Sequence, residues 1–283
     1  RYNSLSEFVN TLSRMVVLNI RVSYSTGFRS PQAYDEDFHV AIVGGERVVT
    51  ILAPDLKQES SQSISGSVDF YHNFGSVQTN LTLEGFFTDL SDVFVLRRLE
   101  QPDAAGNDVL ERYNGGGARV WGMSLEAKAA FPFAMQLQAG VTLQKSRYKD
   151  TEYWSENPAV PGVKKMFRTP DVYGYFTASY SPFKSFQIAL SGTYTGPMLV
   201  QHLQGSGTPI DMAVNTRSFF DANLKLSYDF RLYDHASLQI NAGIQNIFNA
   251  YQGDFDQGYL RDSGYIYGPT MPRSLFAGIR LHI

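Results

Sequence analysis

Residues 135–144 read Met-Gln-Leu-Gln-Ala-Gly-Val-Thr-Leu-Gln, an uninterrupted alternation of apolar and polar positions. Successive side chains of a β-strand point to opposite faces of the sheet. Such a strand places Met135, Leu137 and Val141 on one face and the glutamines on the other. The segment therefore predicts a strand that separates an apolar environment from a polar one.

The same alternation recurs in nine further segments, at about residues 18–25, 63–70, 77–87, 121–131, 172–180, 186–194, 220–230, 238–245 and 275–283. No apolar face carries a charged residue, whereas the polar faces carry Arg21, Asp69, Glu84, Glu126, Lys128, Asp221, Lys225 and Arg280. Contact with lipid explains this asymmetry, because a Lys or Arg at the bilayer midplane costs about 2–4 kcal/mol. The segments exceed the roughly 5–6 residues usual in soluble sheets and approach the 9–11 or so that a tilted strand needs to cross a bilayer.

The connections between these segments alternate between short and long. Four are tight, near residues 72–76, 132–133, 181–185 and 231–235, and five are long, at roughly 26–63, 89–117, 145–170, 195–218 and 246–273. Tight periplasmic turns and long extracellular loops are typical of outer-membrane barrels. We therefore expect an all-β, transmembrane antiparallel barrel with about ten strands in this chain and a periplasmic C-terminus. Aromatic residues near the strand ends suit two interfacial girdles: Tyr24, Phe70, Trp121, Phe131, Tyr180, Phe186, Tyr194 and Phe230.

Composition excludes several other classes of protein. The 283 residues carry a formal net charge of −3, so no basic nucleic-acid footprint is present. With no cysteine, a disulfide scaffold, a thiolate metal site and a cysteine nucleophile are excluded. No run reaches the roughly 18 apolar residues of a membrane-spanning helix. The first residues do not resemble a signal peptide, and we expect the chain to be a mature product or a fragment.

Two stretches resemble sequence boxes of the TonB-dependent outer-membrane transporters. Residues 27–31 (Gly-Phe-Arg-Ser-Pro) resemble the FRAP box, and residues 53–59 (Ala-Pro-Asp-Leu-Lys-Gln-Glu) resemble the NPDLKPE box. The matching positions are Phe28, Arg29, Pro31, Pro54, Asp55 and Leu56. Ser30, Ala53 and Gln58 depart from the boxes, and Ile283 replaces the usual terminal aromatic residue.

The resemblance implies that residues 1–283 are the C-terminal half of a 22-stranded, plugged barrel. Its plug domain, energy-coupling box and first strands would then be absent from this chain, leaving two open sheet edges. The implied function is active uptake of a scarce nutrient, most simply an iron chelate (siderophore or haem). Cobalamin or oligosaccharide uptake within the same family, or a stand-alone ten-stranded porin, adhesin or protease, remains an alternative. The implied partners are the outer-membrane bilayer, the plug, TonB with its inner-membrane energising complex, and a surface lipoprotein; nucleic acid is not among them.

The candidate ligand-binding residues lie in the long loops: Tyr34, His39, Trp154, His202, Tyr259 and Arg261. Haem transporters of the resembled family carry an axial histidine in the loop that contains His39, and His202 is a candidate second ligand. Asp35, Glu36 and Asp37 could instead bind calcium or simply be solvated. Further loop aromatics are candidates for a ligand platform or for loop packing: Tyr153, Tyr251, Phe255, Tyr265 and Tyr267.

No catalytic residue, resident metal or cofactor is expected; iron or cobalt would enter only as part of the transported ligand. None of the five histidines falls on an apolar face, where an outer-membrane phospholipase would need one. The glycine-rich run 114–117 lacks the lysine and the strand-loop-helix context of a phosphate loop, so it is interpreted as a flexible loop.

Overall fold

The computed structural model describes residues 16–32, 48–155, 157–233, 236–269 and 271–282. Every regular element in these ranges is a β-strand. No helix among the described residues is long and apolar enough to cross a membrane. Tyr34–Asp37 and His39 lie outside the described ranges.

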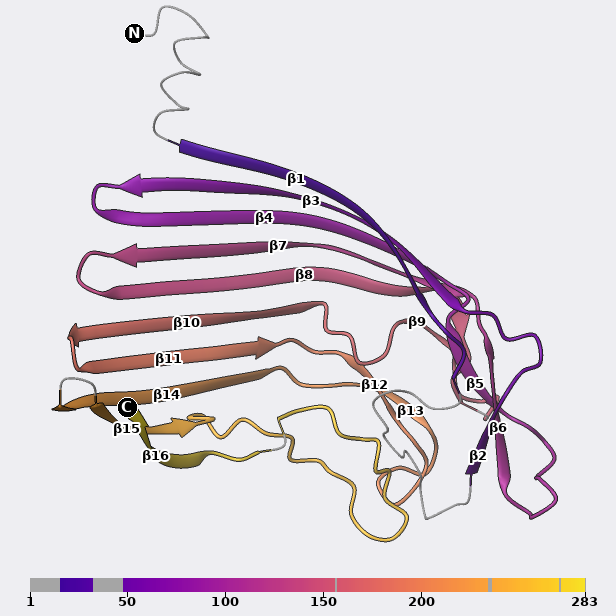
Figure 1. Cartoon of the computed structure of the whole chain (residues 1–283). Coiled ribbons are helices and arrows are strands. Elements are labelled where there is room, and N and C mark those ends of the chain that lie inside the picture. Colours follow the sequence, from indigo (N-terminus) through magenta and orange to yellow (C-terminus); the bar gives the residue numbers. More distant parts are fainter. Residues whose placement is uncertain (1–15, 33–47, 156, 234–235, 270, 283) are drawn as a thin grey trace, which may run out of the picture.

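One large antiparallel sheet contains the ten long strands in chain order (Figure 1). They are β1 (Val16–Arg29), β3 (Glu59–Phe74), β4 (Val77–Ser91), β7 (Gly117–Phe131), β8 (Met135–Glu152), β10 (Val172–Phe183), β11 (Phe186–Thr195), β14 (Phe219–Tyr233), β15 (Ala236–Gln245) and β16 (Ser274–His282). Each pairs with the next along the chain, as in an up-and-down barrel. The ten predicted strands and their alternation of short and long connections are confirmed.

Six short strands lie in the long connections, and the alternation did not predict them. They are β2 (Val48–Leu52), β5 (Phe94–Arg98), β6 (Asp108–Asn114), β9 (Val163–Lys165), β12 (Leu199–His202) and β13 (Met212–Asn215). β2, β6 and β5 form a separate three-stranded sheet, and β12 pairs with β13 in a hairpin. Several long strands also continue past their predicted ends; β8 runs for 18 residues, to Glu152.

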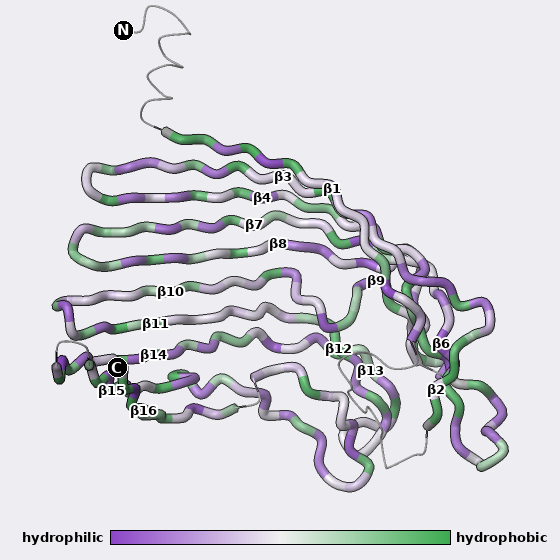
Figure 2. Tube along the Cα trace, in the orientation of Figure 1, coloured by the Kyte–Doolittle hydropathy of each residue, from purple (hydrophilic) through white to green (hydrophobic). Residues whose placement is uncertain are grey.

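The apolar face of the large sheet is exposed rather than packed into a core. Even on the inner strands β4 and β7, Leu83 and Leu125 are 46% and 42% exposed. Figure 2 shows hydrophobic and hydrophilic residues alternating along the long strands. A closed, water-soluble core would bury these side chains, so their exposure agrees with a face that contacts lipid.

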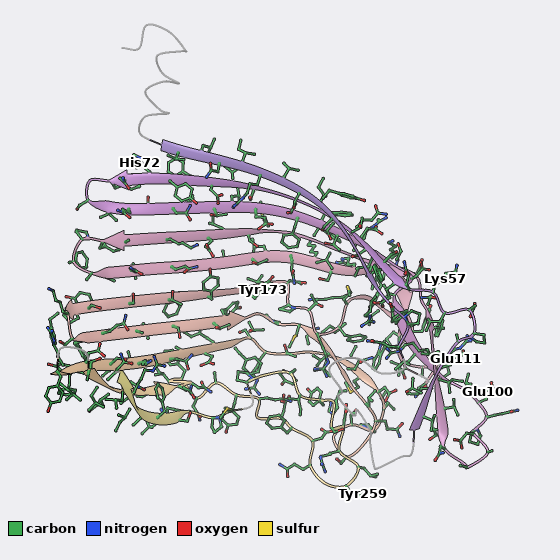
Figure 3. All side chains as sticks on the ribbon, viewed as in Figure 1. Lys57, His72, Glu100, Glu111, Tyr173 and Tyr259 are labelled. Atoms are coloured by element: carbon green, nitrogen blue, oxygen red, sulfur yellow. The ribbon has the colours of Figure 1, made fainter. Side chains whose placement is uncertain are left out.

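The two ends of the sheet differ in chemistry. Figure 3 places His72 beside a short turn, whereas Lys57, Glu100 and Glu111 lie at the opposite end, among the long loops. At the short-turn end, rings from neighbouring hairpins contact one another: Phe131 with Phe133, Phe133 with Tyr180, Phe183 with Phe186, and Tyr228 with Phe183, Phe186 and Phe230. These contacts form two aromatic clusters, one around Phe133 and one around Tyr228, at the end where a girdle is predicted.

The large sheet ends in β1 on one side and β16 on the other. Among the described residues, β1 pairs only with β3 and β16 only with β15. The strand order is therefore open, in agreement with the predicted partial barrel.

Candidate functional site

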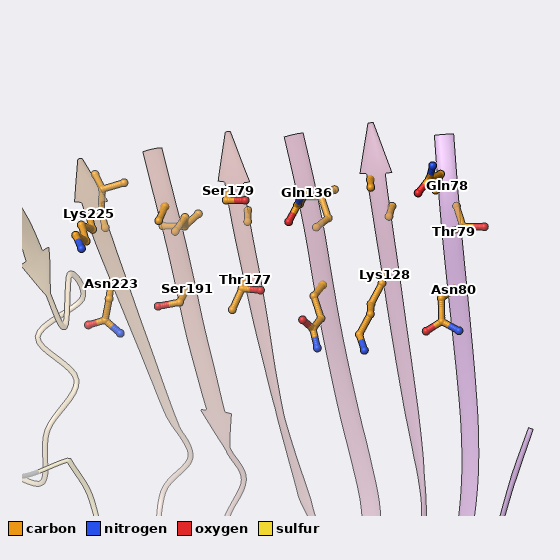
Figure 4. Close-up of a pocket in the computed structure, with 18 of the residues that line it drawn as sticks. Gln78, Thr79, Asn80, Lys128, Gln136, Thr177, Ser179, Ser191, Asn223 and Lys225 are labelled. Atoms are coloured by element: carbon orange, nitrogen blue, oxygen red, sulfur yellow. The ribbon is translucent and has the colours of Figure 1, made fainter. Parts of the chain in front are cut away.

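The polar face of the large sheet encloses a hollow of about 610 Å³ near the short-turn end. Side chains from nine consecutive strands of the large sheet, β3 to β16, line it, and Figure 4 labels residues on β4 to β14. The labelled polar residues include Asn80, Lys128, Thr177, Ser191 and Asn223. This surface corresponds to the lumen wall that the polar faces of the strands predict.

A charge pair within β7 is hydrogen-bonded to polar side chains of the next two strands on this wall. Lys128 Nζ lies 2.6 Å from Glu126 Oε1, and Gln138 Nε2 donates to Glu126 Oε2 at 3.2 Å. Tyr175 donates its hydroxyl hydrogen to Glu126 and accepts one from Gln138 at 2.8 Å. The wall thus offers polar contacts without a large unbalanced charge at this position.

A second pair lies on β1, β3 and β4. The Asp69 carboxylate is buried, accepts from Thr82 Oγ1 at 2.7 Å and lies 2.7 Å from the Arg21 guanidinium. A buried carboxylate needs such partners, because an unpaired charge is costly to desolvate. Both pairs agree with the sequence-based placement of these charges on the polar face.

At the other end, the first two long connections form a compact unit, here called the first loop block (residues 48–58 and 92–116). β2 pairs with β6 in parallel, and β5 pairs with β6 antiparallel. Arg97 and Glu111 form an ion pair across β5 and β6. The block is therefore built mainly from backbone ladders.

The two family boxes meet at the base of this block. Arg29 and Glu59 are cross-strand partners in β1 and β3, with Nε 2.7 Å from Oε2. Glu59 also accepts the backbone N–H of Phe94, whose ring packs 4.9 Å from the Arg29 guanidinium carbon. Phe28 is 72% exposed and faces outward.

The second box makes a turn that docks on β6. Leu56 N donates to Ala53 O at 3.1 Å across Pro54 and Asp55, and Ala53 N donates to Arg112 O at 2.9 Å. The Asn114 side chain holds the end of this turn, because it accepts a hydrogen bond from Lys57 N and donates one to Lys57 O. Pro31, Pro54 and Asp55 are exposed. These contacts indicate a loop-anchoring role for the boxes.

The last three connections form the second loop block (residues 153–155, 157–171, 196–218, 246–269). Its small core consists of Met198, Val200 and Tyr265, with Val214 and Tyr267 packed against it. The His202 ring stacks on Tyr265 at 3.8 Å between centroids. This apolar contact fastens the β12–β13 hairpin to the final loop.

Buried polar side chains join the same segments. Gln252 is fully buried; its Nε2 donates to Tyr265 O at 2.9 Å and its Oε1 accepts from Tyr267 N at 2.8 Å. Arg168, held at a φ of 56°, donates to Gly264 O and, at 2.7 Å, to Ile266 O. Its own backbone N–H donates to Leu199 O at 2.8 Å, so one residue contacts two other connections.

Three aspartates of the final loop accept hydrogen bonds. Asp256 Oδ1 lies 2.9 Å from His202 Nε2, and Asp262 Oδ2 accepts from Leu203 N at 2.8 Å. Asp254 accepts from the hydroxyls of Tyr267, at 2.7 Å, and Tyr265, at 3.2 Å. The final loop is therefore held by hydrogen bonds to these three carboxylates rather than by strand pairing.

The ionisation of this group is perturbed. Burial opposes ionisation of Asp254, but the hydrogen bonds from Tyr267 and Tyr265 outweigh it and lower the pKa of the carboxyl group. Burial, followed by the charge of Asp254, raises the pKa of Tyr265. Burial, followed by the hydrogen bond with Asp254, also raises the pKa of Tyr267. Both phenols are therefore protonated at neutral pH.

The predicted ligand residues occupy different environments. His202 lies in the interior of the second loop block, and Trp154 packs edge-on against Phe167 at 5.3 Å. Tyr259 is 79% exposed at the tip of the final loop (Figure 3), and the exposed Arg261 donates to Gly258 O at 3.2 Å. The structure thus brings His202 together with Tyr265 and Asp256, whereas Tyr259 and Arg261 remain at the surface.

Sequence reasoning did not single out Gln252, Asp254, Asp256, Asp262 or Arg168, which organise the second loop block. The closely spaced Asp254 and Asp256 were a visible signal, but aspartates are also ordinary loop residues. No group of three or more His, Cys, Asp or Glu side chains within the described ranges is arranged to hold a metal ion.

Among the comparisons with known proteins, the match to a family model identifies the family. A search of curated protein sequences gave no match. The family model described as "TonB dependent receptor-like, beta-barrel" matches residues 12–247.

Solved structures share the fold at low sequence identity. The ferric-catecholate import receptor Fiu of E. coli aligns with a TM-score of 0.59 at 20% identity, over 94% of this chain and 33% of that one. The FrpB iron transporter of Neisseria meningitidis gives 0.60 at 19%, over 94% and 37%. The ferripyoverdine receptor of Pseudomonas aeruginosa gives 0.58 at 15%, over 93% and 31%. The chain therefore spans about one third of each of these proteins.

The family match covers most of the chain, and the open sheet of long amphipathic strands has the fold of these receptors. The chain belongs to the TonB-dependent receptor β-barrel family.

Proposed function

We propose that this chain forms the C-terminal wall and half of the capture loops of an outer-membrane transporter that takes up an iron chelate, a siderophore or haem. The observation that carries the proposal is a sheet with an exposed apolar face, a hollowed polar face and structured long loops at one end. A lipid-facing wall around a polar passage suits transport.

The polar hollow supports a plug as the partner on the inner face. Its lining includes amides, hydroxyls and the ammonium groups of Lys128 and Lys225 beside apolar side chains such as Leu137, and Asn80 Nδ2 there is buried with no hydrogen-bond partner among the described residues. Buried polar atoms are normally satisfied, so a plug segment or water would complete this surface. In this proposal the short turns and the C-terminus face the periplasm, where TonB and its energising complex act on the plug.

The cargo assignment draws on the structural neighbours. Fiu is described as a ferric-catecholate import receptor, and the Pseudomonas receptor was solved with ferripyoverdine. A related fold also occurs in the copper transporter OprC. The exposed final loop, with Tyr259 and Arg261, offers an aromatic face and a cation to an anionic chelate.

Growth on single iron sources tests the proposal. Deletion of the full-length gene should abolish growth on one ferric siderophore or on haem while sparing growth on ferrous iron. Removal of TonB should give the same loss. Growth that depends instead on cobalamin or an oligosaccharide would replace the cargo, and uptake that persists without TonB would contradict the proposal.

Two variants separate capture from folding. Tyr259→Ala and Arg261→Ala should weaken chelate binding to whole cells without reducing the amount of receptor in the membrane, because both side chains are exposed. Equal binding by the wild type and both variants would remove the tip of the final loop from the capture surface. Haem titration of His39→Ala tests the predicted axial ligand, and an unchanged Soret band would exclude it.

A further inference from the structure

A row of charged residues crosses the outward face of the large sheet at its long-loop end. Asp89 on β4 is the cross-strand partner of Arg119 on β7. Arg119 is also the partner of Arg147 on β8, and Arg147 is that of Lys165 on β9. Directly opposed residues have their side chains on the same face. Since alternate residues of a strand also share a face, Arg119 lies on the outward side with Trp121.

Two further lysines lie on the same face, beside this row. Lys145 is the cross-strand partner of Trp121, and the ammonium group of Lys149 forms an ion pair with Asp89. The five cations are here called the basic patch: Arg119, Lys145, Arg147, Lys149 and Lys165.

Two carboxylates pair with members of the basic patch. Asp89 accepts from Arg119 Nε at 2.9 Å and is shared with Lys149. Asp171 Oδ2 lies 2.8 Å from Lys165 Nζ. These two carboxylates leave the five cations with a formal net charge of +3, although the whole chain carries −3.

Lys145 and Arg147 have no such partner. Both are exposed, and within the described part of the chain neither forms a side-chain hydrogen bond or an ion pair. Arg147 lies between Arg119 and Lys165, and like charges directly opposite each other are destabilising. A bound anion would remove this repulsion, so the arrangement favours an anionic ligand.

The height of the basic patch matches that of lipid headgroups. Phe131, at the short-turn end of β7, and Trp121 are ten residues apart, which is about 34 Å along the strand. At a tilt of about 45° this is about 24 Å along the membrane normal, close to the roughly 25 Å of the apolar band between two aromatic girdles. Arg119 lies about 5 Å further out, within the headgroup layer.

The basic patch is accessible from the lipid. β7 and β8 are inner strands of the sheet (Figure 1), so further strands of a larger barrel would extend from β1 and β16 and leave this face uncovered. Below the patch the outward face is apolar and exposed, with Met123 and Leu143 as cross-strand partners. An occupant would therefore contact cations with its head and apolar side chains with its tails.

The size of the basic patch favours more than one phosphate. Neighbouring strands lie about 4.8 Å apart, so Arg119 and Lys165 are separated by about 10 Å across β8. Lys145 and Lys149 are about 14 Å apart along that strand. This area exceeds that of a single phosphate and suits a headgroup that carries several.

We propose that the basic patch binds the phosphate groups of a multiply phosphorylated glycolipid in the outer leaflet of the outer membrane. Lys145 and Arg147 contact the phosphates directly, and the acyl chains lie along Met123 and Leu143. The proposal rests on the outer-membrane orientation given in the proposed function. Lipid binding needs neither cargo nor TonB, so the two proposals can fail separately.

Titration of the full-length receptor in a non-ionic detergent with bisphosphorylated lipid A, followed by native mass spectrometry, tests the basic patch. The double variant Lys145→Gln, Arg147→Gln should bind roughly 30-fold more weakly than the wild type, because each cation changes the affinity for an anionic lipid surface about fivefold. Lipid A without its phosphates should bind weakly and equally to both proteins. Added salt should weaken binding to the wild type.

The matched control is the double variant Lys57→Gln, Lys164→Gln, which removes the same charge at the same end of the sheet. Both side chains are exposed, and Lys164 lies on the opposite face of β9 from Lys165. Its affinity for lipid A should equal that of the wild type. Neither Lys145 nor Arg147 has an internal partner to lose, so all three proteins should resist heat equally in a detergent gel.

Three results would overturn the proposal. The first is a wild type that does not bind lipid A, and the second is equal affinity in the wild type and the Lys145→Gln, Arg147→Gln variant. The third is binding of phosphatidylglycerol or inorganic phosphate as tight as that of lipid A. Growth on iron sources does not enter any of these measurements, so failure of uptake would leave their outcome unchanged.

Discussion

The two loop blocks stand on the same end of the sheet but are held together by different interactions. The first block is a three-stranded sheet whose backbone groups pair in ladders, with the Arg29–Glu59 ion pair at its base. The second block has one short hairpin, and its remaining segments are joined by a few buried side chains such as Gln252. Backbone ladders do not depend on residue identity, whereas side-chain ties do. Substitutions should therefore act more strongly on the second block.

The largest effect is expected for Gln252→Leu in the second block. Leucine fills similar volume but leaves Tyr265 O and Tyr267 N without partners, at a cost of about 2–4 kcal/mol in local stability. Hydrogen exchange of the amides in 246–269, measured in the full-length receptor, should accelerate accordingly. Gln257→Leu, at an exposed position of the same loop, is the control. Equal rates of amide exchange in Gln252→Leu and Gln257→Leu would contradict the proposal that buried side-chain hydrogen bonds stabilise the second block.

A smaller effect is expected for Glu59→Gln in the first block. Glutamine still accepts from the Phe94 N–H but loses its charge opposite Arg29, and a part-exposed ion pair is worth about 0–1 kcal/mol. Exchange of the β5 and β6 amides should increase slightly at low salt and hardly at all at high salt, because salt screens the pair. The control is Glu100→Gln at the exposed hairpin tip. A large effect that does not depend on salt would show that the backbone hydrogen bonds of the three-stranded sheet are not the main stabilising interaction in this block.

The smallest effect is expected for the stability of the final loop in acid, which depends on the ionisation of Asp254. The pKa of Asp254 is lowered in the folded loop, so its ionised form contributes stability above the ordinary aspartate pKa of about 3.9. That contribution is lost as the pH falls through the lowered value. Pepsin cleavage within 246–269 should therefore rise only in strongly acidic solution, and less steeply in Asp254→Asn. Opening between pH 7 and pH 5 that requires Asp254 would contradict the assignment.

The large sheet was predictable because lipid imposes a strict rule on every second residue. Each of the ten long strands follows that rule, as residues 135–144 show most clearly. β2 and β5 lie in the loops and face no bilayer, so their residues, Val-Val-Thr-Ile-Leu and Phe-Val-Leu-Arg-Arg, do not alternate. Periodicity therefore carried no information about them.

The loop residues were less predictable because their roles depend on the fold. His202 and Trp154 were selected by residue type, and both are packed within the loop block. Gln252 acts on backbone groups 13 and 15 residues away, and nothing in its immediate sequence indicates those partners. The ligand-binding roles of Tyr34, His39, Trp154, His202, Tyr259 and Arg261 remain predictions.

The length of β8 has a consequence for what reaches the receptor from outside. Its 18 residues, at about 3.4 Å each, extend roughly 60 Å, which at a tilt of about 45° still spans roughly 43 Å along the membrane normal, more than the 30 Å or so of the bilayer core. The hydrogen-bonded wall would then rise above the lipid as a stiff collar. Bulky molecules outside the cell would contact this collar first. Shortening a loop would reduce the height of the collar but would not separate its hydrogen-bonded strands.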